Sequence, residues 1–158
     1  MLIEFDNMPD TSKAWIYQSD RQMNSEEIKD INKGLISFCN TWTTHNKDVH
    51  ASFKLYPWFI CVFVDESKND ASGCSIDKMF NLVKHFSIKY GIDYFNRSSI
   101  AFIDQNKIKV TSLSEFKKNI SPDTIFFNNL VNTKSQFIDS WKTTVRDSWL
   151  MKYVLIDN

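Results

Sequence analysis

Residues 58–64 are apolar at every position, and the run breaks abruptly into a polar loop at residues 65–77. A strand that is apolar on both faces is typical of the centre of a sheet covered on both sides. A loop that leaves a central strand and leads into a helix often carries functional side chains. This boundary therefore predicts a buried central strand followed by a candidate site.

Two segments have the apolar spacing of amphipathic helices. The first follows Asn24, which is placed as an N-cap with Glu27 three residues later. Its apolar stripe consists of Ile28, Ile31, Leu35, Phe38 and Trp42. The second begins at Ser75 as the predicted cap and ends at Gly91. Its apolar face consists of Ile76, Met79, Phe80, Val83, Phe86 and Tyr90.

Shorter patterns predict the remaining strands. Residues 14–18 form an aromatic strand, and residues 49–55 alternate, which predicts a half-exposed strand with Ser52 on its polar face. Residues 99–103 and 107–111 predict a hairpin whose lysine-bearing second arm is an exposed edge strand. Residues 124–127 predict a further strand, followed by one or two helices.

This order predicts an α+β fold with a ferredoxin-like βαββαβ core, an extra edge strand and an aromatic helical C-terminal tail. We expect a single domain over residues 1–158, with the core at about 13–120 and the C-terminal extension at about 121–158. The aromatic residues of the tail need cover, either from the open face of the sheet or from a second subunit.

Composition narrows the classes of function. The chain has 19 basic and 19 acidic residues, which argues against nucleic-acid binding through a basic field. It lacks an apolar stretch of membrane-spanning length, and its first residues do not resemble a secretory signal, so we expect no membrane partner. Three widely spaced cysteines predict neither a disulfide framework nor a cysteine–zinc site, and a cytoplasmic location is expected. We expect no metal and no cofactor.

Glycine is scarce, with only three residues in the chain. A nucleotide-binding Walker A loop needs the spacing Gly-x-x-x-x-Gly-Lys-Ser/Thr, because backbone amides must approach phosphate closely. The sequence contains no such segment, so ATP hydrolysis is not expected.

The polar loop after the central strand is the first candidate site. Asp65, Ser67, Ser72, Cys74 and Ser75 are the predicted ligand-binding residues, since they precede the free amides of a helix N-terminus. The alternative interpretation is a helix-capping connection without a ligand.

Cys74 could also act as a nucleophile, because a thiol beside a helix N-terminus can be activated. His45 or His50 would be its base, since the predicted topology brings their loop to the same end of the sheet. The alternative is that Cys74 only packs.

A second polar cluster contains Gln18, Asp20 and Arg21, just after the first strand. Arg21 could bind a carboxylate or phosphate. The alternative is a turn with a surface ion pair. The predicted topology places this cluster at the sheet end opposite Cys74.

Residues 14–21, residues 64–67 with 71–77, and residues 127–131 carry a resemblance that spans nearly the whole chain. In them the chain resembles a small family of uncharacterised bacterial proteins that often carry the label "ABC transporter ATPase". The resemblance implies no known activity and no catalytic residue.

Three hypotheses of function follow. The leading one is a soluble intracellular domain that binds a small ligand or protein without chemistry. The second is an enzyme that uses Cys74 with His45 or His50. The third is a structural homo-oligomer in which the C-terminal tail forms the interface.

Overall fold

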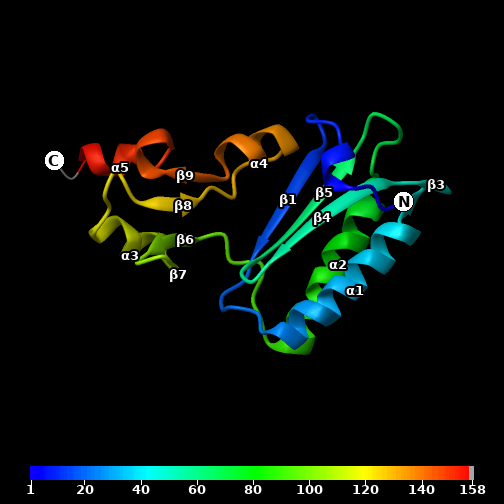
Figure 1. Ribbon diagram of the computed structural model, residues 1–158, viewed down its shortest axis with the longest axis horizontal. Helices are drawn as coiled ribbons and strands as arrows, with labels where there is room; N and C mark the ends of the chain where they lie inside the picture. The colour runs from blue at the N-terminus through cyan, green and yellow to red at the C-terminus, as the bar shows by residue number, and fades with distance from the viewer. Residues whose placement is uncertain (157–158) are drawn as a thin grey trace.

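A computed structural model describes residues 1–156 and shows mixed helices and antiparallel strands, an α+β architecture. Figure 1 shows two sheets that lie beside one another, with two long helices on the outer face of the first. The first sheet contains β1 (Lys13–Gln18), β5 (Phe59–Asp65) and β4 (His50–Tyr56), in the order β1-β5-β4. The predicted central strand is thus confirmed as the middle strand of this sheet.

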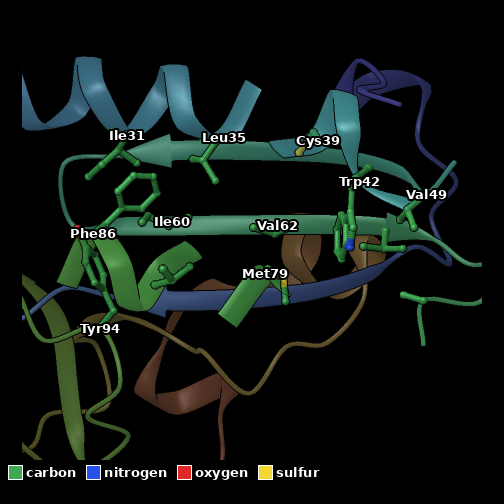
Figure 2. Packing of buried hydrophobic residues seen from close by; sticks show 14 of the residues in the cluster. Ile31, Leu35, Cys39, Trp42, Val49, Ile60, Val62, Met79, Phe86 and Tyr94 are labelled. Atoms are coloured by element: carbon green, nitrogen blue, oxygen red, sulfur yellow. The ribbon is translucent and has the colours of Figure 1, made fainter. Parts of the chain in front are cut away.

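One face of the first sheet is covered by α1 (Ser25–Thr41) and α2 (Gly73–Tyr90). The Asn24 side chain and the Glu27 side chain cap α1 reciprocally, as predicted. Gly91 ends α2 in the left-handed conformation, with φ of 63°. Figure 2 shows the core between the helices and β5, which contains Ile31, Leu35, Ile60, Val62, Met79 and Phe86.

Gly34 brings the two helices close together. A Cβ atom at this position would lie 2.7 Å from the ring of Phe86 on α2. The glycine inside the helical pattern therefore marks close packing between α1 and α2.

The opposite face of the sheet is covered by the N-terminal segment and the C-terminal tail. The 3-10 helix η1 (Phe5–Asn7) and α4 (Lys134–Ser140) pack there. The buried Lys134 joins them, since its Nζ donates to the carbonyl oxygens of Phe5 (2.9 Å) and Met8 (2.7 Å). Ser52 is buried under this cover, so the prediction of a half-exposed strand was wrong there.

The second sheet has the strand order β7-β6-β8-β9. The hairpin of β6 (Ser99–Asp104) and β7 (Lys107–Ser112) is confirmed, with β7 at the sheet edge. On the other side of β6 lie β8 (Ile125–Phe127) and β9 (Lys142–Thr144). Three short helices accompany the second sheet: α3 (Leu113–Lys118), η2 (Val145–Asp147) and α5 (Met151–Ile156). Elsewhere, α1 is followed by a short hairpin of β2 (Thr43–Thr44) and β3 (Lys47–Asp48).

The ferredoxin-like topology is not confirmed. Strands β1, β4 and β5 have the expected positions, but β6 pairs with β7 and β8 instead of adding to β1. The free edge of β1 instead receives residues 132–134, from the predicted tail.

Candidate functional site

The polar loop at residues 66–72 meets the β2–β3 hairpin at one end of the first sheet. The backbone N–H of Ser72 donates to Oγ1 of Thr44 (3.3 Å), and Asn69 Nδ2 donates to the carbonyl of Asp48 (3.3 Å). Between them lies a shallow hollow of about 280 Å³, which includes His45. The expectation that the histidine loop reaches this end therefore agrees with the structure.

The polar groups of this loop are largely occupied by local bonds. Ser72 is the N-cap of α2, where Ser75 was predicted, and its Oγ accepts from the N–H of Ser75 (3.2 Å). Ser75 is buried, and its Oγ donates to the carbonyl of Thr43 (2.9 Å). The two hydroxyls thus hold the helix start against the hairpin.

Asp65 is also engaged. Its Oδ1 accepts from the hydroxyl (2.6 Å) and the backbone N–H (2.9 Å) of Ser67. Burial acts to raise the pKa of the Asp65 carboxyl, but these two hydrogen bonds hold it below its usual value. The arrangement shapes the turn after β5.

Cys74 is exposed in the first turn of α2. His45 lies in the β2–β3 turn with a φ of 48°, and His50 is opposite Asp65 in the β4–β5 ladder. Among residues 1–156, no hydrogen bond joins Cys74 to His45 or His50. The hydrogen-bonded nucleophile and base of a cysteine enzyme are therefore not formed here.

The second polar cluster is divided among structural contacts. Arg21 forms two hydrogen bonds to the Glu27 carboxylate, at 2.9 and 2.7 Å, and a third to the carbonyl of Tyr90 (2.7 Å). Asp20 Oδ1 accepts from the N–H of Asp93 (3.0 Å). The cluster is a turn with an ion pair, and it lies near Pro57, at the end away from Cys74, as the topology predicts.

Replacement of Arg21 with alanine is expected to destabilise the fold by about 1.5 kcal/mol at neutral pH, because a buried carboxylate loses its charged donor. The side chain of Arg21 is 43% exposed, which reduces the effect. The hydrogen bond from Arg21 holds the pKa of Glu27 below its usual range. The stabilisation from the Arg21–Glu27 pair is therefore fully present above the ordinary pKa of a glutamate carboxyl. It is lost as the pH falls through the lowered pKa of Glu27 in the folded protein.

Urea midpoints of the wild type and Arg21→Ala, measured at neutral pH and in acid, check this expectation. The difference between the two proteins should shrink below about pH 4.5, the ordinary range of a glutamate carboxyl. A difference that stays constant into strong acid would contradict the role of the Glu27 charge.

A second hollow, with a volume of about 570 Å³, lies along the edge of β1 that does not pair with β5. Its wall is built from parts of residues 14–17, 76–80, 94–100 and 126–132, together with Trp149. We call this hollow the β1 groove.

One side of the β1 groove is aromatic. Phe95 packs against Phe80, with ring centroids 4.8 Å apart, and its edge meets Tyr17 at 6.0 Å. Trp15 and Trp149 also line the groove. Burial raises the pKa of Tyr17 to about 12, so its hydroxyl is neutral under ordinary conditions. The indole N–H of Trp149 is buried with no acceptor among the described residues.

Another part of the groove wall is the segment that contains Asn128, Asn129 and Asn132, and hydrogen bonds to neighbouring residues fix its position. Asn129 Nδ2 donates to Oε1 of Gln18 (2.8 Å), and Asn129 Oδ1 accepts from the indole N–H of Trp141 (3.0 Å). Asn132 accepts through its carbonyl from the N–H of Ala14 (2.9 Å). The wall is therefore fixed at both ends, and Gln18 of the second polar cluster supports it.

Sequence reasoning did not find the β1 groove, because its residues come from five separate segments. The available indications were the amide-rich segment at residues 128–132 and the tail aromatics, which could stack on a planar ligand.

Comparisons with protein-family profiles, curated proteins and solved structures give no significant match. None of the helices within residues 1–156 is long and apolar enough to cross a membrane. In the same part of the chain, no three His, Cys, Asp or Glu side chains gather in a group that could hold a metal ion.

Proposed function

We propose that the protein is a non-catalytic binding domain whose ligand occupies the β1 groove. The observation that carries this proposal is the hollow of about 570 Å³ with an aromatic side and an amide side. Ligand sites in proteins are commonly concave, of a few hundred cubic ångströms, and mainly apolar with a few polar groups that fix orientation.

The preformed wall adds support. Both atoms of the Asn129 side-chain amide form hydrogen bonds, and Phe95 packs between Phe80 and Tyr17. Few side chains therefore need to become ordered when a ligand binds. Binding to a wall that is already ordered loses less conformational entropy.

The enzyme hypothesis has less support. Ser72 and Ser75 are occupied at the start of α2, and Cys74 lacks a hydrogen-bonded base among the described residues. An exposed cysteine at a helix start does not by itself indicate catalysis.

Two other parts of the proposal concern location and assembly. We place the protein in the cytoplasm, which Cys39, Cys61 and Cys74 support as three unpaired cysteines. A homo-oligomer formed through the tail has less support, since the tail aromatics already pack within the chain. Phe127, Phe137 and Trp141 pack on the first sheet. Phe126, Trp149 and Tyr153 pack in the cluster of the second sheet. Strands β1, β4 and β5 with α1 and α2 resemble the first five elements of a ferredoxin-like core.

Titration with anilinonaphthalene sulfonate, followed by NMR of the indole N–H groups, tests the proposal. We expect saturable binding that shifts the signals of Trp15 and Trp149, which line the groove. The signal of Trp42 should not move, because that indole is buried elsewhere and donates to the carbonyl of Ser75 (3.0 Å).

A matched pair of variants gives the control. Leu130 on the groove wall is 68% exposed, and Ile138 on α4 is 58% exposed but outside the groove. Leu130→Asp should weaken binding of the probe at least tenfold, roughly the effect of losing a central apolar contact, whereas Ile138→Asp should not. Equal affinity in both variants, or no saturable binding, would overturn the proposal.

A further inference from the structure

We infer that the ligand of the β1 groove is a small aromatic acid. Its carboxylate binds Arg97 and the hydroxyl of Tyr17, and its ring packs beside Phe95. This inference rests on the function proposed above and names the class of its ligand.

The chain itself closes the groove at two points along β1. At one point the N–H of Ala14 donates to the carbonyl of Asn132 (2.9 Å). At the other, Gln18 Nε2 donates to the carbonyl of Ser99 (3.5 Å), and Gln18 Oε1 accepts from Asn129 (2.8 Å). Four strand steps separate Ala14 from Gln18, a length of roughly 13 Å. The space between these contacts therefore favours a small molecule over a length of polypeptide.

Arg97 and Tyr17 contribute polar groups that have no partner within residues 1–156. The guanidinium of Arg97 forms no ion pair or hydrogen bond there, and the hydroxyl of Tyr17 forms no hydrogen bond. Burial raises the pKa of the Tyr17 hydroxyl, and the positive charge of Arg97 opposes this rise, so the two groups lie near one another. A guanidinium and a neutral hydroxyl are both donors to a carboxylate.

The aromatic side chains beside these two groups favour a ring in the ligand. Phe95 comes two residues before Arg97, and its ring contacts those of Tyr17 and Phe80. Phe80 lines the groove and is 41% exposed, so a planar group can reach it. Aromatic rings attract one another in offset or edge-to-face arrangements. A ring joined to a carboxylate therefore matches both the apolar and the polar part of this wall.

Asp77 is a second exposed charge in the groove wall. It lies on α2, about one helical turn before Phe80. Of the two charges, that of Arg97 is the one that acts on the Tyr17 hydroxyl. An anion is therefore favoured beside Tyr17, whereas a cation would be favoured beside Asp77, and the test separates the two.

The test compares three probes that share one ring system: 2-naphthoate, 2-naphthamide and 2-naphthylmethylammonium. Each is titrated into isotope-labelled wild-type protein and followed by NMR. We expect 2-naphthoate to shift the amide signals of Tyr17 and Arg97 and to bind at least tenfold more tightly than 2-naphthamide. The reason is that hydrogen bonds from a cation to a carboxylate are about twice as strong as those between neutral groups.

Variants of the protein assign the contact. Arg97→Gln should lower the affinity for 2-naphthoate at least tenfold, to about that of 2-naphthamide, whose own affinity should not change. Arg146→Gln is the matched control, because Arg146 is an exposed arginine outside the groove that pairs with Asp123. It should leave both affinities unchanged. Tyr17→Phe keeps the ring and removes the hydroxyl, and it should weaken binding of 2-naphthoate several-fold.

The outcomes separate this inference from the proposed function. Equal affinity for 2-naphthoate and 2-naphthamide, or tighter binding of the ammonium probe than of 2-naphthoate, overturns the aromatic acid alone. An undiminished preference for 2-naphthoate in Arg97→Gln does the same, as does binding of anilinonaphthalene sulfonate without binding of 2-naphthoate. Failure of all four probes to bind overturns both.

Discussion

Replacement of Phe63 with alanine is expected to lower the free energy of unfolding by roughly 3–5 kcal/mol, as large aromatic truncations in a packed core do. Phe63 is fully buried at the centre of β5, which pairs with strands on both sides. Its ring lies 4.8 Å from that of Phe5 and 5.0 Å from that of Phe137. The substitution therefore opens a cavity where the N-terminal segment, the sheet and α4 meet.

Lys109→Ala is the control for this measurement. Lys109 lies on the edge strand β7, its side chain is 53% exposed, and its ammonium forms a surface ion pair with Asp104, so the change should stay within about 0.5 kcal/mol. Urea unfolding of both variants gives the comparison. Equal urea midpoints of the two variants would contradict the packing of Phe63 between the N-terminal segment, the first sheet and α4.

The elements defined by local patterns were predicted well. The reciprocal cap of Asn24 and Glu27 fixed the start of α1, and the uninterrupted apolar run identified β5 as the central strand. The cap is a contact between residues three positions apart, and an uninterrupted apolar run indicates burial on both faces of a strand. Both features can be identified from the sequence of the element alone.

Features that depend on distant partners were not predictable in this way. The alternation of β4 indicated an exposed face at Ser52, but this residue is buried, and η1 of the N-terminal segment packs against β4. Likewise, β6 has the right place in the sequence to pair with β1, yet it pairs with β7 and β8. A strand pattern shows which residues can pair, and it does not show which of several strands will be the partner.

The same difference between local patterns and distant partners explains which candidate site could be predicted. The 66–72 loop and the His45 turn were predicted to lie at the same end of the sheet. This prediction depends only on the order of β1, β4 and β5 and on the helices that connect them, and it agrees with the structure. The β1 groove depends on the turn at residues 128–131 returning to β1 from more than a hundred residues away. No local pattern records that return.

Trp141 is buried against Phe59, Phe127 and Phe137, with ring centroids 4.8, 4.9 and 4.6 Å away. Trp141→Ala is expected to destabilise the fold by roughly 3–5 kcal/mol, and Ile138→Ala, on the exposed side of α4, by less than about 0.5 kcal/mol.

The dependence on protein concentration identifies what covers the tail. The partners of Trp141 all belong to its own chain, so the thermal midpoints of wild type and Trp141→Ala should not change with protein concentration. A structure completed by a second subunit would instead unfold at higher temperature as the concentration rises, because association stabilises only the folded chain. A midpoint that rises with concentration in the wild type but not in Trp141→Ala would therefore assign the tail to an interface between subunits. A constant midpoint together with the large loss in Trp141→Ala would assign it to the face of the β1-β5-β4 sheet.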